Sequence, residues 1–306
     1  MTKVLVATEK PFAKVAADQI RSIFEQAGYR CDFLEKYTDK NELLKAVADA
    51  EALIIRSDKI TEEVLNAAPK LKIVVRAGAG YDNVDLAAAT AHDVVVMNTP
   101  GQNSNAVAEL VFGMMVYQAR NHYNGTSGTE LKGKKLGIHA YGNVGKNVAR
   151  IARGFGMEVV AYDPFVPDSA IEADGVTVVK DRDELYSSCD YISLHIPATK
   201  ETIQSINYDL LSKMKQGATL VNTARKEVIH EEDLLKFFRD NDTLQYISDI
   251  APDNQAQLEA EFPARCFFTP KKMGAQTAEA NINAGIAAAN QIISFFEEGI
   301  TRFKVN

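Results

Sequence analysis

Short apolar runs alternate with amphipathic helical segments from the first residues of the chain onward. The runs are KVLVA (3–7), CDFLE (31–35), ALIIR (52–56) and KIVVR (72–76), and the helical face between the first two consists of Ala16, Ile20, Ile23, Phe24 and Ala27. Strands that alternate with helices predict a parallel sheet covered by helices. The pattern pauses at MNTPGQNSNAVAEL (97–110), where Pro100, Gly101 and several asparagines interrupt regular structure before an apolar helix over 106–120. We therefore expect the chain to cross into a second domain near residue 99.

A second alternating series begins at KKLGIHA (134–140). Its further strands are EVVAY (158–162), VTVV (176–179), DYISL (190–194), ATLVN (218–222), QYISDI (245–250) and CFFT (266–269). An alanine-rich helix over 277–299 ends the chain and, at about 35 Å, is long enough to rejoin the first domain. The pattern predicts an α/β protein with a doubly wound parallel-sheet Rossmann domain over 99–274 and a smaller domain over 1–98 and 275–306.

Composition narrows the class of protein. With 306 residues, 46% of them hydrophobic, the chain can bury a large core. The three cysteines are widely spaced, which argues against disulfides and leads us to expect buried thiols, and neither they nor the histidines have metal-ligand spacing. The net charge of −7 argues against a nucleic-acid partner. The first residues lack a signal peptide and no long apolar run could span a membrane, so we expect a cytoplasmic protein.

The segment AYGNVGKN (140–147) is a glycine-rich turn between a strand and a helix. A phosphate loop of the Walker A type needs glycine where Ala140 stands and a hydroxyl where Asn147 stands, so that interpretation fails. The dinucleotide pattern GxGxxG fits, with Ala140 replacing the first glycine and Gly142 and Gly145 as the others. The following helix has an apolar stripe made of Val144, Val148, Ile151, Ala152 and Phe155. The backbone N–H groups that would bind the pyrophosphate belong to Tyr141, Gly142, Asn143, Val144 and Gly145.

Asp163 follows the next strand, 21 positions after Gly142. A carboxylate at this distance binds the ribose hydroxyls and repels the additional phosphate of NADP. The sequence therefore predicts NAD as the cofactor.

Several blocks in order along nearly the whole chain together resemble the D-isomer-specific 2-hydroxyacid dehydrogenases. Besides the glycine turn, they are LKIVVRAGAGYDNVDL (71–86), NTPGQNSNAVAEL (98–110), SLHIPATKET (193–202), VNTARKEVIHEEDL (221–234) and TPKKMGAQTAEA (269–280). The resemblance implies a flavodoxin-like smaller domain, a homodimer and an active site in the cleft between the domains. The segments IIRSDKIT and FKVN are most similar to members that oxidise 3-phosphoglycerate to 3-phosphohydroxypyruvate, the first step of serine biosynthesis. Because the chain ends after FKVN, we expect no serine-binding regulatory domain.

The resemblance also assigns residues around the cofactor. It implies that His195 and Pro197 lie on the adenine side with Thr202 nearby. Thr223 and Ala224 would flank the nicotinamide, and Asp249 would face its carboxamide. No metal is assigned.

Hydride transfer needs a cation that fixes the 2-hydroxy acid and a group that exchanges the hydroxyl proton. Arg225, just after a strand, is suited to the first role because its planar fork can bind a carboxylate. Lys226 follows it where the family usually has glycine. For the second role the family uses a histidine in TPHxG with an upstream acid, but this chain has TPKKMG and Asn254 at those places.

A lysine can replace the histidine only if its amine is neutral. Burial and neighbouring cations, such as Arg225 and the charged nicotinamide, would lower the ordinary lysine pKa of about 10.4, and an acid partner would raise it again. Counting back from Gly274 selects Lys272, and counting forward from Pro270 selects Lys271. We favour Lys272, and loss of activity is the other explanation of the change.

Substrate binding is expected at two places in the smaller domain. Arg56, Ser57 and Lys59 follow a strand and offer two cations and a hydroxyl for a phosphate. The resemblance further implies a carboxylate-binding loop, which consists of Ala77, Gly78 and Ala79 and is helped by Asn103.

Two alternatives stay open at this point. The first is a reductase of an unphosphorylated acid, such as glyoxylate or hydroxypyruvate, or another D-2-hydroxyacid reductase, which would need no phosphate site. A non-catalytic, NAD-responsive binding protein similar to corepressors of this fold would account for the missing histidine.

Overall fold

The computed structural model describes residues 1–306 and divides them into two compact units. The smaller unit comprises Met1–Asn103 and Gln276–Asn306, and the larger unit comprises Ser104–Ala275. Both are α/β, as predicted. None of the helices is both long and apolar enough to cross a membrane.

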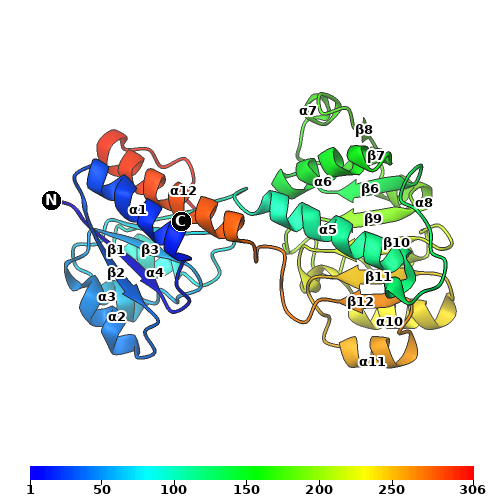
Figure 1. The fold of residues 1–306 in the computed structure, drawn as a ribbon, viewed down its shortest axis with the longest axis horizontal. Helices are drawn as coiled ribbons and strands as arrows, with labels where there is room; N and C mark the ends of the chain where they lie inside the picture. The colour runs from blue at the N-terminus through cyan, green and yellow to red at the C-terminus, as the bar shows by residue number, and fades with distance from the viewer. The chain divides into compact units, whose positions relative to one another are not determined.

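The smaller unit contains a five-stranded parallel sheet in the order β2-β1-β3-β4-β5, and Figure 1 labels its first three strands along the chain, β1, β2 and β3. Helices cover both faces, because alternate strand residues point to opposite sides. The strands are β1 (Lys3–Thr8), β2 (Arg30–Glu35), β3 (Ala52–Ile55), β4 (Ile73–Arg76) and β5 (Val95–Asn98). The helices are α1 (Lys14–Gln26), α2 (Lys40–Ala46), η1 (Val47–Asp49), α3 (Glu62–Asn66), α4 (Leu86–Ala91) and α12 (Ala278–Glu298).

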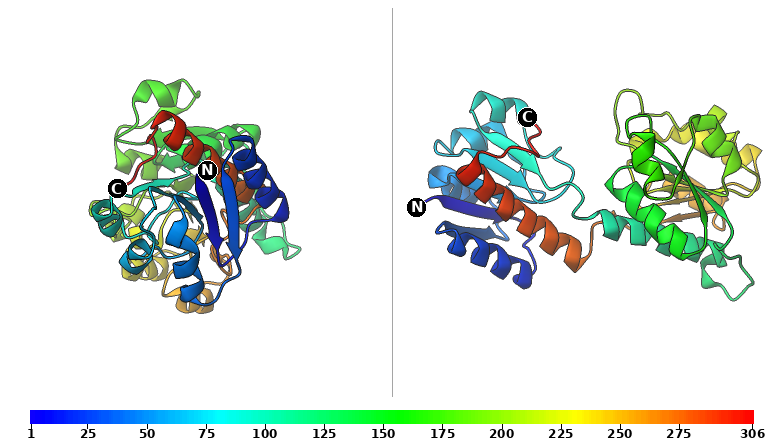
Figure 2. Two further views of the ribbon diagram at one scale, coloured as in Figure 1. Left: turned by 90° about the vertical axis from the view of Figure 1, so that its left-hand side faces the viewer. Right: turned by 90° about the horizontal axis from the view of Figure 1, so that it is seen from above.

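Buried apolar side chains pack on both faces of this sheet. Val4, Val6 and Ile54 pack beneath α1 and α12, whereas Leu5 and Leu53 pack beneath α2, α3 and α4. Helix α12 runs beside α1 across one face of the sheet, so the end of the chain completes the unit that its beginning forms (Figure 2). Strand β5 was not predicted, because it runs directly into the loop at Thr99–Asn103.

The larger unit has a seven-stranded parallel sheet in the order β12-β11-β10-β9-β6-β7-β8. This is the doubly wound order, which reverses between β6 and β9. Its strands are β6 (Lys135–His139), β7 (Glu158–Tyr162), β8 (Thr177–Val178), β9 (Tyr191–Leu194), β10 (Thr219–Asn222), β11 (Gln245–Ser248) and β12 (Cys266–Phe268). Its helices are α5 (Ser104–Ala119), η2 (Asn121–Tyr123), α6 (Asn143–Gly154), α7 (Asp168–Glu172), α8 (Arg182–Ser188), α9 (Tyr208–Leu211), η3 (Lys226–Val228), α10 (Glu231–Asp240) and α11 (Gln255–Glu261). The predicted fold class is confirmed.

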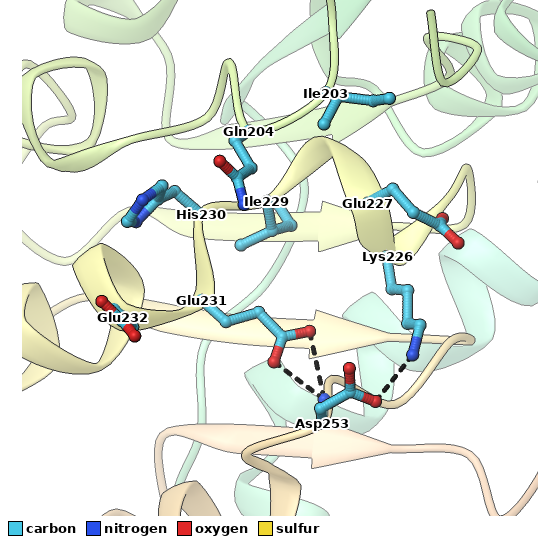
Figure 3. Close-up of a pocket in the computed structure, with 9 residues that line it drawn as sticks. All are labelled: Ile203, Gln204, Lys226, Glu227, Ile229, His230, Glu231, Glu232 and Asp253. Carbon is cyan, nitrogen blue, oxygen red and sulfur yellow. Dashed lines mark hydrogen bonds and ion pairs between the residues drawn. The ribbon is translucent and has the colours of Figure 1, made fainter.

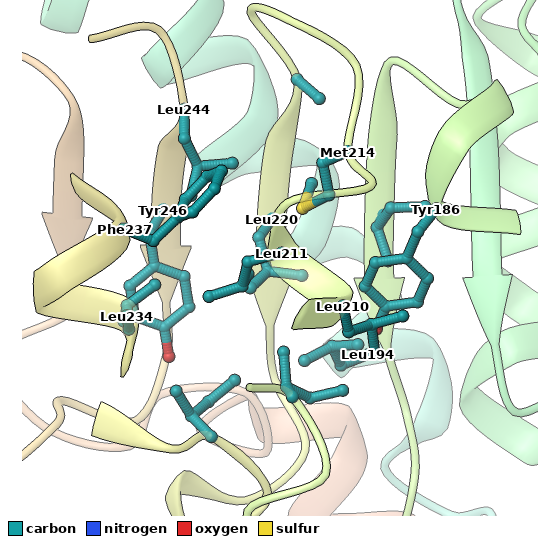
Figure 4. Close-up of a cluster of buried hydrophobic side chains, with 14 of the residues drawn as sticks. Tyr186, Leu194, Leu210, Leu211, Met214, Leu220, Leu234, Phe237, Leu244 and Tyr246 are labelled. Atoms are coloured by element: carbon teal, nitrogen blue, oxygen red, sulfur yellow. The ribbon is translucent and has the colours of Figure 1, made fainter. Parts of the chain in front are cut away.

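The core of the larger unit is also divided by its sheet. Leu220 and Tyr246 face α8, α9 and α10 (Figure 4), whereas Val221 and Ile247 face α5 and α6. One residue of the predicted stripe on α6 differs, since Phe155 is 39% exposed and stacks on Phe112 at the helix end. Of the three free thiols, Cys189 and Cys266 are buried and Cys31 is only half-buried.

Candidate active site

The glycine turn connects β6 to α6 in the larger unit. Ala140 adopts φ +81°, a left-handed conformation that glycine tolerates far better than alanine. Gly142 is the residue before the helix, and no side chain caps the first N–H groups of α6. A helix N-terminus without a protein cap is suited to an anion such as a pyrophosphate. A Cβ on Gly142 would have no neighbour within 4 Å, so the space beside this turn is open.

Gly145 has the opposite surroundings. A Cβ built there would lie 2.5 Å from the carbonyl oxygen of Ala140 and 3.1 Å from Cγ2 of Ile138. Only glycine lets α6 pack this closely on the end of β6. This is the packing role that the third glycine of a dinucleotide turn performs.

Asp163 follows β7 and is bound to the turn. Its Oδ2 accepts a hydrogen bond from the backbone N–H of Tyr141 at 2.7 Å, and its Oδ1 accepts one from that of Phe165 at 2.8 Å. The carboxylate thus lies beside the open helix N-terminus, where the sequence predicted that it binds ribose hydroxyls.

His139 and His195 end neighbouring strands next to this turn. Burial lowers the pKa of His139 to about 4 and that of His195 to about 3, so both rings are neutral near pH 7. Nδ1 of His139 lies 3.1 Å from the hydroxyl of Tyr186, and Nε2 of His195 lies 3.0 Å from that of Ser193. Beyond His195, the Thr202 hydroxyl donates to the carbonyl of Pro197 and closes that loop.

The turn after β10 carries Arg225. The buried Asn222 side chain closes the turn, since its Oδ1 accepts from Ala224 N–H at 2.9 Å and its Nδ2 donates to the Arg225 carbonyl at 3.0 Å. Arg225 is half-buried, and its only hydrogen-bond acceptor in the protein is the carbonyl of Ala224. The other guanidinium N–H groups are available to an anion. Thr223 is buried as well, and its hydroxyl has no hydrogen-bond partner in the protein, which leaves it available to a ligand.

Lys226, where the family has glycine, begins the short helix η3. Its ammonium lies 2.6 Å from Oδ1 of Asp253, and this hydrogen bond raises the pKa of Lys226. Both residues line a cavity of about 610 Å³ that also includes Gln204, His230 and Glu231 (Figure 3). Glu231 accepts from the backbone N–H of Asp253 at 2.8 Å, so this carboxylate is engaged in holding a loop.

The segment Thr269–Gly274 carries the two candidate lysines after β12. Both Lys271 and Lys272 are exposed. From the sequence, burial and neighbouring cations are expected to keep one lysine amine neutral. Within this unit neither lysine is buried, so neighbouring cations remain as the cause. Asp249, at the end of β11, is 1% exposed and binds this segment through its carboxylate.

The proposed phosphate-binding residues lie in the smaller unit after β3. Ser57 and Lys59 are exposed, but Arg56 is already engaged. Its Nη1 donates to the carbonyls of Lys10 and Pro11 at 3.0 Å, and its Nη2 donates to the side chain of Asn281. A phosphate would have to share this guanidinium with three protein acceptors.

The loop Ala77–Ala79 follows β4 in the same unit. Gly78 has φ +150°, and a Cβ there would collide with the guanidinium of Arg76, which crosses the loop. The carbonyl of Ala79 accepts from the side chain of Asn98, and Gly78 accepts from Thr99 N–H. Asn103 is the last residue of this unit before α5.

Sequence reasoning missed the polar residues that hold the site loops. Asn222, Glu231 and Thr269 were not selected, although each binds backbone groups of a loop that carries a candidate residue. A polar residue at the end of a buried strand is the signal that could have identified Asn222 and Thr269.

Known proteins are similar to this chain over most of its length. The family described as D-isomer specific 2-hydroxyacid dehydrogenase, NAD binding domain, matches residues 106–270. A D-3-phosphoglycerate dehydrogenase of Methanocaldococcus jannaschii is 35% identical over 83% of this chain and 51% of its own length. A hydroxypyruvate reductase of Thermotoga maritima is 35% identical over 87% of this chain and 90% of its own length. This chain thus spans about half the length of the archaeal relative and most of the bacterial one.

A solved structure is similar over the whole chain. The NAD+-bound 3-phosphoglycerate dehydrogenase of Entamoeba histolytica is 48% identical, covers 100% of this chain and 98% of its own, and superposes with a TM-score of 0.88. Together with the family match, this confirms NAD as the cofactor.

Proposed function

Since the chain belongs to the D-isomer-specific 2-hydroxyacid dehydrogenase family, we propose that it oxidises 3-phosphoglycerate to 3-phosphohydroxypyruvate with NAD, as the first step of serine biosynthesis. The observation that carries the proposal is the guanidinium of Arg225, which donates to the Ala224 carbonyl alone and has its other N–H groups available to an anion. It lies at the end of β10, beside the strand that anchors the lysine segment. The 48% identity to a phosphoglycerate dehydrogenase supports the choice of substrate.

Each residue has a chemical task in this reaction. Arg225 binds the substrate carboxylate and the oxygen at C2, which places the C2–H bond for transfer. Lys272, as the neutral amine, accepts the hydroxyl proton while the C2 hydride leaves. Bound NAD supplies the hydride acceptor, and the first N–H groups of α6, Asp163 and the hydroxyl of Thr223 hold it. Arg56, Ser57, Lys59, the loop Ala77–Ala79 and Asn103 bind the phosphorylated acid, and the chain functions as a homodimer in the cytoplasm.

The proposal is tested by following NAD reduction with 3-phosphoglycerate over a range of pH. The rate should rise above neutral pH as the lysine amine loses its proton. Lys272→Ala should lose most of kcat with little change in NAD affinity, and Lys271→Ala is the matched control. Full activity of Lys272→Ala together with loss in Lys271→Ala would move the acid–base role to Lys271.

A second candidate is the reduction of unphosphorylated 2-oxo acids such as glyoxylate or hydroxypyruvate. It is favoured by the similarity to a hydroxypyruvate reductase and by the protein acceptors that already occupy Arg56. In that case Lys59→Ala would leave KM unchanged, and hydroxypyruvate with NADH would be turned over faster than 3-phosphoglycerate with NAD. NAD binding without turnover of any acid would instead support the corepressor-like alternative.

A further inference from the structure

Asp249 accepts three hydrogen bonds from the segment that carries the two lysines. Its Oδ1 lies 2.6 Å from the backbone nitrogen of Met273 and 2.9 Å from the hydroxyl of Thr269, and its Oδ2 lies 2.8 Å from the nitrogen of Gly274. The donors lie on both sides of Pro270–Lys272. The carboxylate therefore closes a loop with the lysines at its tip, and we call Thr269–Gly274 the lysine loop.

The contacts of Gly274 show how closely the lysine loop approaches Asp249. A Cβ on Gly274 would lie 3.0 Å from Oδ2 of Asp249 and 3.1 Å from Cγ2 of Val107 on α5. A larger residue would have to push the loop away from the carboxylate. The single proton of the Thr269 hydroxyl has three acceptors within reach, which are Asp249 Oδ1 and the Lys271 carbonyl at 2.9 Å and the Asp249 carbonyl at 3.0 Å. Each of them belongs either to the loop or to its anchor, so the hydroxyl lies between the two.

Asp249 is itself fixed from the strand side. Its backbone N–H donates to the carbonyl of Asn222 at 3.0 Å, and the side chain of Asn222 closes the turn of Arg225. One short path of hydrogen bonds thus runs from the Arg225 turn through Asn222 and Asp249 to the lysine loop. Buried and charge-assisted hydrogen bonds of this kind hold loops in one geometry.

We infer that Asp249 is a positioning residue, which holds the lysine loop in its catalytic conformation. The inference rests on the proposed function, because it gives the loop its catalytic task. It differs from the family-based expectation that Asp249 faces the nicotinamide carboxamide, since three of the acceptor positions of its carboxylate are used by the loop. Geometry at a proton-transfer group matters strongly, because a displacement of about 1 Å can cost roughly 100-fold in rate.

Thr269 offers the sharper variants, since changing it leaves the Asp249 charge in place. Thr269→Val removes the hydroxyl and keeps the shape, and Thr269→Ser keeps the hydroxyl as the conservative control. Asp249→Asn removes the negative charge that strengthens all three bonds, and its NH2 group would face one of the donors. Hydrogen–deuterium exchange of residues 270–275 reports the loop directly, and kcat and NAD affinity are measured on the same full-length proteins.

The expected result is faster exchange of the Met273 and Gly274 amides in Thr269→Val and Asp249→Asn, by about tenfold or more. Both variants should lose kcat by about 10- to 100-fold with NAD affinity unchanged, and Thr269→Ser should behave as the parent protein. Weaker NAD binding in Asp249→Asn with unchanged exchange would overturn the inference and restore the carboxamide role.

Faster exchange with unchanged kcat would also overturn it, since the loop geometry would not matter for the reaction. Failure of the proposed function is recognised separately. If neither Lys271→Ala nor Lys272→Ala reduces kcat, the lysine step itself is wrong, whatever the exchange of the loop shows. Should Asp249→Asn fail to fold, the Thr269 pair decides alone.

Discussion

The close approach of α6 to the end of β6 predicts a large difference between two glycines of the same helix. In Gly145→Ala the new Cβ would lie 2.5 Å from the carbonyl oxygen of Ala140. This is roughly 0.8 Å short of the ~3.3 Å at which a carbon and a carbonyl oxygen normally meet. The carbonyl cannot easily yield, because the N–H of the same peptide unit, that of Tyr141, donates to Oδ2 of Asp163 at 2.7 Å. Helix α6 must therefore shift.

Overpacking of this kind costs about 1–3 kcal/mol, and the better helix propensity of alanine returns up to ~1 kcal/mol. We expect Gly145→Ala to lower the free energy of unfolding by about 1–2 kcal/mol. Gly154 is the matched control, since a Cβ there has no neighbour within 4 Å. Gly154→Ala should be neutral or raise the free energy of unfolding by up to ~1 kcal/mol.

The assay is urea unfolding followed by circular dichroism, with NAD affinity measured on the same samples. Gly145→Ala should unfold at lower urea and bind NAD more weakly, because the N-terminus of α6 has moved from Asp163. An unchanged midpoint and affinity for Gly145→Ala would show that α6 does not depend on this contact, and the reasoning about the turn would be wrong.

Three further predictions concern the same region. Gly142→Ala should leave the urea midpoint nearly unchanged, because its Cβ meets no protein atom, and should weaken NAD binding, because the Cβ extends into the open space beside the turn; strong NAD binding by this variant would contradict that placement. Ala140→Gly should raise the free energy of unfolding by about 1 kcal/mol, since it relieves the φ of +81°, and a lower urea midpoint would count against strain at this residue. The pKa of His139 is about 4 in the folded chain and ~6.5 in the unfolded chain. The free energy of unfolding should therefore be highest above pH 6.5 and fall by about 3 kcal/mol toward pH 4, because only the unfolded chain binds the proton in this range. In His139→Gln this loss should be smaller in urea titrations at several pH values, and equal slopes would refute the assignment.

The sequence predicted those features whose pattern is local. The glycine turn is eight residues long and directly follows a recognisable strand, and Asp163 follows the next strand at a characteristic distance. The doubly wound fold and the NAD cofactor could therefore be predicted, and both predictions are confirmed. Strand β5 was missed because no turn separates it from the irregular segment that follows. The site residues stay predictions.

The supporting contacts of the site could not be predicted from the sequence. Asp249 and Thr269 are 20 positions apart, and nothing in either segment indicates that their side chains meet. The engagement of Arg56 depends on Asn281, which is 225 positions away along the chain. Long-range pairs of polar groups are determined by the packing of the units, and an amphipathic pattern carries no information about them.

Asp249 anchors the lysine loop at its two ends. This arrangement affects which residue types an enzyme of this fold can carry at the tip between them. The carboxylate contacts two backbone amides and one threonine hydroxyl, and none of these belongs to Lys271 or Lys272. Side chains at the tip can therefore be replaced, and even one residue added, while the anchoring points stay where they are. Evolution could substitute one proton acceptor for another at this position without rebuilding the scaffold beneath it.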